Sequence, residues 1–166
     1  ALELIEAFSQ DEGSIWTEWK LIIAGDGVER QSATQLVKRL NLEDRIAVVG
    51  EITGQVKIDT FASASIFALP TFDDEGLPIS VLEAMAAGCA LLTTMAGGLA
   101  EAVTDQVHGV VMDSVSGEAI KDGIGRLANE DEFRNQCQRN SHETAWNYYA
   151  SSVIIGRFQQ MLEDLG

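Results

Sequence analysis

The fold is decided by residues 70–94, which read PTFDDEGLPISVLEAMAAGCALLTT. The pattern is a strand end, an acidic loop, a helix opened by Pro78 and a second apolar strand at 90–94. Between Gly76 and Ala100 the only formally charged residue is Glu83. A carboxylate in such a run needs hydrogen-bond donors if it is even half-buried, which makes Glu83 a candidate functional residue.

Apolar runs alternate with helical patterns along the rest of the chain. We expect strands at 19–24, 45–50, 65–69, 90–94 and 107–112, and helices near 2–10, 29–40, 55–63, 78–87, 118–129, 131–146 and 150–164. Continuously apolar strands that alternate with helices are typical of parallel sheets covered on both faces. The predicted fold class is therefore α/β with a doubly wound parallel sheet, and residues 1–166 suit one domain.

Ligands of such sheets bind beyond the carboxyl ends of the strands, where loops lead into helices. Four segments fall at these strand ends, namely Asp26, Glu51, residues 73–77 and residues 94–99. The sequence therefore predicts the binding site on this edge of the sheet.

Charge and cysteine content exclude several classes of protein. The chain has 11 Lys and Arg against 26 Asp and Glu, a formal net charge of −15. This balance argues against nucleic-acid binding, which requires clustered basic residues, and against docking on anionic lipid. We interpret it as a solvated acidic surface. Cys89 and Cys137 are too few for a disulfide framework or a Cys-based zinc site, so we expect reduced cysteines and a cytoplasmic protein.

The first residues of the chain have features that are typical of an internal segment of a longer protein. It begins without Met and already shows helical spacing at Leu2, Leu4, Ile5 and Phe8. We therefore expect an N-terminally truncated fragment.

Two further motifs have ordinary interpretations. Gly25-x-Gly27 follows a strand, but Arg30 occupies the third glycine position of a dinucleotide fingerprint, so we expect a tight turn and no NAD site. Asp73, Asp74 and Glu75 offer three carboxylates, which could hold a hard cation. Solvated acids before a helix N-terminus are the favoured interpretation of Asp73 and Asp74.

The helix that follows Pro78 offers free amides at its start, and these suit a diphosphate. Gly76 lets a ligand approach the backbone there. Glu83 lies at the flank of the predicted core-facing stripe, where a ribose diol would supply it with two donors. The stripe consists of Leu82, Met85, Ala86 and Cys89. The alternative is a structural carboxylate satisfied by the helix dipole or a nearby Arg. Gly97 and Gly98 form either an ordinary turn or a loop that lines the ligand-facing edge.

The run from Glu75 to Gly88, EGLPISVLEAMAAG, resembles the E-x7-E signature of retaining glycosyltransferases of the GT4 type (glycosyl transferases group 1). Further matches are AGDG at 24–27, VVGEI at 48–52, FALPT at 67–71, GGLAE at 97–101 and HGVVMD at 108–113. The resemblance implies the C-terminal, nucleotide-sugar-binding domain of a GT-B architecture, which has two Rossmann-like domains. The acceptor-binding N-terminal domain of the same protein and the family's upstream Arg and Lys clamp would lie outside this chain.

The resemblance also implies roles for single residues. Glu75 would contact hydroxyls of the donor sugar as the catalytic residue, Glu83 would accept from the ribose, and Ile52 would hold the base. The remaining donor-binding residues would surround the sugar and diphosphate with backbone: Gly76, Leu77, Pro78, Ile79, Gly97 and Gly98. By the same resemblance, the donor would be an NDP-sugar and a hexosyl group would move to a hydroxyl acceptor, and no metal or other cofactor is implied.

Two other functions are compatible with the residues. One is a catalytically degenerate Rossmann-like binding or interaction module. The other is an acidic regulatory domain of the receiver type, which is disfavoured because Asp73 and Asp74 have no Lys at a suitable strand end.

Overall fold

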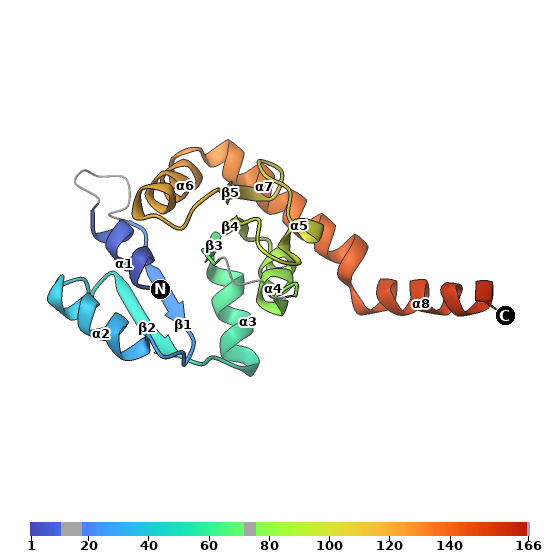
Figure 1. The fold of residues 1–166 in the computed structure, drawn as a ribbon, viewed down its shortest axis with the longest axis horizontal. Coiled ribbons are helices and arrows are strands. Elements are labelled where there is room, and N and C mark those ends of the chain that lie inside the picture. Colours follow the sequence, from blue (N-terminus) through green and yellow to red (C-terminus); the bar gives the residue numbers. More distant parts are fainter. Residues whose placement is uncertain (11–17, 72–75, 166) are drawn as a thin grey trace.

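The computed structural model describes residues 1–10, 18–71 and 76–165, and Figure 1 shows their arrangement. The first half of the chain contains α1 (Leu2–Ser9), β1 (Leu21–Ala24), α2 (Arg30–Arg39), β2 (Ile46–Gly50), α3 (Gly54–Ser63) and β3 (Ile66–Leu69). The second half contains α4 (Ile79–Ala87), β4 (Ala90–Thr94), α5 (Leu99–Ala102), β5 (Gly109–Met112), α6 (Gly117–Asn129), α7 (Asp131–Thr144), the π-helical turn η1 (Ala145–Tyr149) and α8 (Ser151–Leu165).

The central sheet has the strand order β3-β4-β5 and is parallel throughout. Leu91 of β4 stands opposite Phe67 on one side and Gly109 on the other. A Cβ at Gly109 would lie 1.8 Å from the carbonyl oxygen of Leu91, and Gly109 has φ of 156°. Only glycine fits there, so this residue permits β5 to pair with β4.

Both faces of β4 are covered, which explains why all five of its residues, Ala90–Thr94, are buried. Leu91 belongs to a cluster with Val81 and Met85 of α4, whereas Leu92 belongs to a cluster with Ile120 of α6. Successive side chains of a strand point to opposite faces, so the two leucines serve two separate cores. The prediction of an α/β fold with parallel strands covered by helices is confirmed for this sheet.

The β1 and β2 strands form a second parallel sheet. Their inner side chains pack with α1 and α2 around Ile5, Leu36 and Ile46. Ile22 and Val49 on the outer side are 47% and 43% exposed. The described part of this sheet therefore buries one face, although its apolar runs predicted burial on both.

Of the C-terminal helices, α6 and α7 pack on the sheet, and α8 extends from the body of the molecule (Figure 1). Ser116 caps α6, since its Oγ accepts a hydrogen bond from the Ala119 amide at 3.2 Å. Beyond α7, the turn η1 leads into α8, which projects away from the body (Figure 1). Ile154, Ile155 and Met161 of this helix are exposed.

Three local predictions need correction. The last strand begins at Gly109 and not at residue 107, because the amides of Val107 and His108 bond to the Thr104 carbonyl in a turn. The helix α5 was missed because four residues show no periodicity. On α4 the buried side chains are Val81, Ala84 and Met85, so the predicted stripe that contained Leu82 and Ala86 is displaced.

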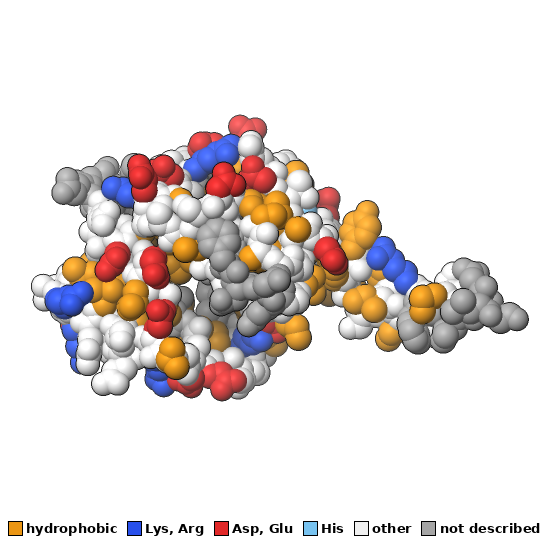
Figure 2. Space-filling view, viewed as in Figure 1, with side chains coloured by type: hydrophobic (Ala, Val, Ile, Leu, Met, Phe, Trp, Pro, Cys, Tyr) orange, Lys and Arg blue, Asp and Glu red, His pale blue; other side chains and the backbone are white. Residues whose placement is uncertain are grey.

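The surface agrees with the acidic composition. On the face in Figure 2, acidic side chains are scattered over the body and do not form one patch. Within the described residues, no helix combines the length and the apolar character needed to cross a membrane.

Candidate functional site

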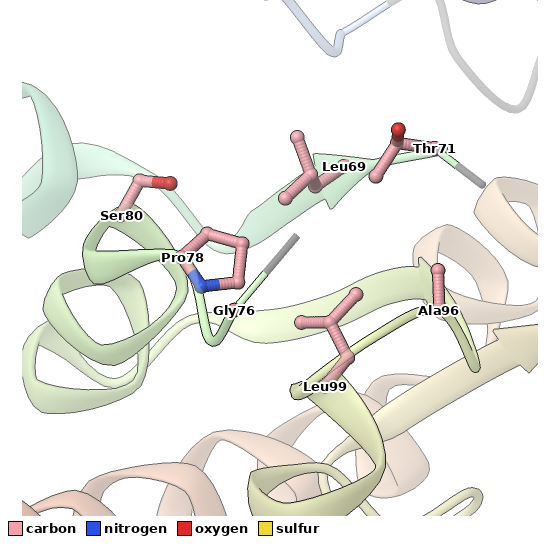
Figure 3. Close-up of a pocket in the computed structure, with 7 residues that line it drawn as sticks. All are labelled: Leu69, Thr71, Gly76, Pro78, Ser80, Ala96 and Leu99. Atoms are coloured by element: carbon pink, nitrogen blue, oxygen red, sulfur yellow. The ribbon is translucent and has the colours of Figure 1, made fainter. Parts of the chain in front are cut away.

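A pocket lies at the carboxyl ends of β3 and β4, on the edge that the sequence predicted. Its volume is about 240 Å³. Its walls come from the end of β3, the start of α4 and the loop before α5 (Figure 3). The lining residues are Leu69, Thr71, Gly76, Pro78, Ser80, Ala96 and Leu99. Of the predicted donor-binding residues, the pocket thus brings together Gly76 and Pro78.

Two buried threonines of β4 fix the wall made by β3. Thr93 Oγ1 donates to the Leu69 carbonyl oxygen at 3.1 Å, and Thr94 Oγ1 donates to the carbonyl oxygen of Thr71. Both threonines are at most 2% exposed. The Thr93 bond reinforces the last ladder pair, Leu69 with Thr93, and the Thr94 bond extends the contact between the two segments beyond it. The pocket wall is therefore positioned by the core.

The start of α4 forms a second wall. Pro78 is the N-cap residue with φ of −64°, and in the described part of the chain no side chain caps this end. The amide of Val81 bonds to the Pro78 carbonyl at 3.0 Å, and Ser80 lines the pocket. Helix N-termini carry partial positive charge and free amides, so this end can bind an anion.

The glycine loop before α5, which contains Gly97 and Gly98, packs directly against the α4 entrance, residues 76–78. A Cβ at Gly98 would lie 2.6 Å from the Leu77 amide nitrogen and 3.0 Å from the Gly76 carbonyl carbon. Gly97 has φ of 52°, a conformation that favours glycine. The loop is therefore in close contact with the backbone of Gly76 and Leu77, while the donor-binding role of Gly97 and Gly98 stays a prediction.

Glu83 does not line this pocket but faces α3. Its Oε2 lies 2.7 Å from Lys57 Nζ, and the two side chains are about equally half-buried, at 36% and 34% exposure. Oε2 is itself shielded from solvent, so the ammonium is its partner. The structural interpretation of Glu83 anticipated an Arg or the helix dipole, whereas the partner is a lysine that sequence reasoning missed.

The other predicted residues lie around the same helix entrance. Leu77 is half-buried between Gly76 and Pro78, and Ile79 is 73% exposed at the first position of α4. Ile52 is half-buried just before α3. Glu75, like Asp73 and Asp74, lies outside the described residues. The roles given to all these residues stay predictions.

The Gly25-x-Gly27 segment leaves β1, and a turn at Val28 and Glu29 follows it and leads into α2. Arg30 pairs with Asp26 at 2.5 Å, and Asp26 Oδ2 also accepts from the Glu51 amide at 3.3 Å. The guanidinium of Arg30 packs against Gly50. These contacts join the carboxyl ends of β1 and β2.

The groups of the described chain whose pKa values are shifted by their surroundings lie in the core. Burial raises the pKa of Cys89 to about 11 and lowers the pKa of His108 from 6.5. His108 accepts from the Thr104 amide at Nδ1 and faces Thr144 Oγ1 with Nε2, both at 3.0 Å. Neither group adjoins the pocket, so their roles are structural. No group of three or more His, Cys, Asp or Glu placed to hold a metal occurs among the residues described.

The family model for glycosyl transferases group 1 matches residues 2–144. The chain belongs to this family. The matched range contains every wall of the pocket, the Lys57–Glu83 pair and the predicted donor-binding residues. The predictions of the family and of the α/β fold are therefore confirmed.

Curated relatives are similar over most of this chain. An exopolysaccharide phosphotransferase of Streptomyces coelicolor is 28% identical over 148 residues, which are 89% of this chain and 15% of that protein. The N-acetyl-alpha-D-glucosaminyl L-malate synthase of Bacillus anthracis is 24% identical over 163 residues, which are 98% of this chain and 42% of that protein. The chain thus spans less than half of the length of these relatives.

The fold also has close counterparts among solved structures. The crystal structure of HepE from Anabaena in complex with UDP superimposes with a TM-score of 0.83 at 20% identity. The superposition includes 98% of this chain and 44% of the HepE chain.

Proposed function

We propose that this chain is the C-terminal, donor-binding domain of a retaining glycosyltransferase that moves a hexosyl group from an NDP-sugar to a hydroxyl acceptor. The observation that carries the proposal is the pocket between Gly76, Pro78 and the loop before α5, at the free N-terminus of α4. Family membership over residues 2–144 supports it. The site lies on the sheet edge where doubly wound folds bind ligands.

In the proposed complex the donor wraps around the start of α4. The diphosphate faces the first amides of the helix, and the sugar enters the pocket lined by Gly76 and Ala96. Glu83 accepts from the ribose on the side of α3, and Ile52 holds the base before that helix. Glu75 contacts the sugar hydroxyls.

The proposed reaction breaks the bond between the anomeric carbon and the diphosphate oxygen and forms a bond to the acceptor oxygen. The electron pair of the broken bond stays on the diphosphate oxygen, which takes up the proton of the acceptor hydroxyl, and the nucleoside diphosphate leaves. Negative charge develops on the leaving diphosphate, and the oriented amides of α4 stabilise it electrostatically.

The proposal includes a second domain, which binds the acceptor and completes the donor site. The fraction of the relatives that this chain spans supports it. A metal-independent mechanism and a cytoplasmic location also belong to the proposal. The location is supported by the buried, unpaired state of both cysteines of the chain.

The test is titration of the ¹⁵N-labelled chain with UDP, GDP and ADP, followed by chemical-shift mapping. We expect weak binding of at least one nucleotide, with the largest shifts at Ile52, Gly76 to Ile79, Glu83 and the Gly97–Gly98 loop. Shifts confined to regions away from these residues, such as α2 and α8, contradict the proposed site. Sugar transfer by these 166 residues alone would contradict the two-domain part.

The ion pair of Glu83 with Lys57 is also compatible with an alternative function, that of a binding module without catalysis. If this pair has only a structural role, the chain is a degenerate binding module that retained the fold. The same titration separates the two functions, because a degenerate module shows no nucleotide-dependent shifts at Glu83 or Ile52.

A further inference from the structure

The ion pair that joins α3 to α4 has a geometry suited to a ligand-positioning role. Lys57 Nζ lies 2.7 Å from Glu83 Oε2, an oxygen that is shielded from solvent. The Glu83 side chain is 36% exposed as a whole, and because Oε2 is shielded, that exposure belongs to its other atoms. One carboxylate oxygen is therefore held by Lys57, so a ligand that contacts this carboxylate must use the other oxygen, Oε1.

We propose that Lys57 is a positioning residue, which holds the carboxylate of Glu83 so that its other oxygen accepts hydrogen bonds from the ribose hydroxyls of the donor. This inference rests on the proposed function, since it assumes that Glu83 meets the ribose. A carboxylate has lone pairs on both oxygens and can keep one ammonium contact while it accepts from a hydroxyl. Lys57 itself touches no part of the donor.

The location of the pair supports this role. Lys57 lies in the first turn of α3, shortly after Ile52, and Glu83 lies in the second turn of α4. Glu83 is thus one helical turn from Ser80, which lines the pocket. A ligand that extends from the pocket along α4 toward Ile52 passes Glu83.

By orienting the Glu83 side chain before the ligand binds, Lys57 would contribute to ligand affinity more than to the stability of the fold. A glutamate side chain has several rotatable bonds, and fixing them before the ligand arrives removes an ordering cost from binding. Half-exposed ion pairs contribute little to folding, so loss of this pair should affect the ligand more than the fold.

The experiment compares each ribonucleoside diphosphate with its 2′-deoxy form by titration calorimetry, using UDP, GDP and ADP. We expect the unaltered chain to prefer the ribose form of its nucleotide by about tenfold, and Glu83→Gln to remove most of that preference. Lys57→Met should reduce the preference to about twofold to threefold with little change for the deoxy form. Lys57→Arg should restore part of it, and Lys38→Met, an exposed lysine of α2, should leave it intact.

The outcomes distinguish the two proposals. If the unaltered chain binds no nucleotide, or shows no preference for ribose, the donor site at Glu83 is wrong and the role of Lys57 falls with it. If Glu83→Gln removes the preference but Lys57→Met keeps it, only the positioning role is overturned. Equal weakening of both sugar forms by Lys57→Met indicates a structural tie or a diphosphate contact and also overturns it. Lys57→Gln replaces Lys57→Met if circular dichroism shows that the methionine variant fails to fold.

Discussion

Gly98→Ala tests whether the contact between the glycine loop and the α4 entrance shapes the pocket. The added Cβ would lie 2.6 Å from the Leu77 nitrogen, whereas ordinary contacts of carbon atoms are about 3.5 Å. The loop and the α4 entrance must therefore separate by roughly 1 Å, and neither contact atom belongs to a flexible side chain. Gly98 has φ of −71°, which alanine adopts without strain, so the effect is purely steric.

Overpacking of this kind costs about 1–3 kcal/mol of unfolding free energy. We expect urea denaturation to show that loss, and nucleotide titration to show roughly tenfold weaker binding, because the pocket walls move apart. Gly125→Ala is the matched control, since its Cβ would meet no atom within 4 Å inside α6. It should stabilise the chain by about 0.5–1 kcal/mol. An unchanged or raised stability of Gly98→Ala would refute the close packing of the two segments.

Three further predictions concern the core and the caps. Because burial lowers the pKa of His108 below 6.5, the unfolded chain binds the proton more tightly, and stability is lost as the pH falls through 6.5 toward the lower pKa of the folded chain. Urea denaturation should show a flatter pH profile for His108→Asn than for the exposed control His142→Asn. Cys89, with its pKa raised to about 11, should react with a thiol reagent at about pH 8 only after denaturant is added, and rapid labelling of the native chain would contradict its burial. Ser116→Ala should cost about 1 kcal/mol by removing the cap of α6, while Ser32→Ala at an exposed position of α2 should not.

The sequence predicted the order of strands and helices well, because apolar runs and Gly or Pro boundaries are local signals. Pro78 and Gly88 mark the ends of α4 as expected, and Gly88 adopts the left-handed conformation with φ of 83°. The edge of the sheet that holds the pocket was also predictable, since it follows from parallel strand order alone.

The parts that were missed depend on contacts between distant segments. Lys57 meets Glu83 only because α3 and α4 lie side by side, and no local pattern marks that pair. Leu69, Ala96 and Leu99 line the pocket with apolar side chains that look like ordinary core residues in the sequence. The exposed side of β1 and β2 was unpredictable for the same reason, since an apolar run does not say which of its faces is covered.

The double burial of β4 has a consequence for the dynamics of the site. Its amides pair with strands on both sides, and Leu91 and Leu92 are at most 1% exposed. Amide protons in such positions exchange with deuterium only when the whole domain opens, whereas those of half-covered strands exchange through local opening. We expect β4 to exchange last and β2 much earlier. The pocket is therefore attached to the strand whose hydrogen bonds survive longest.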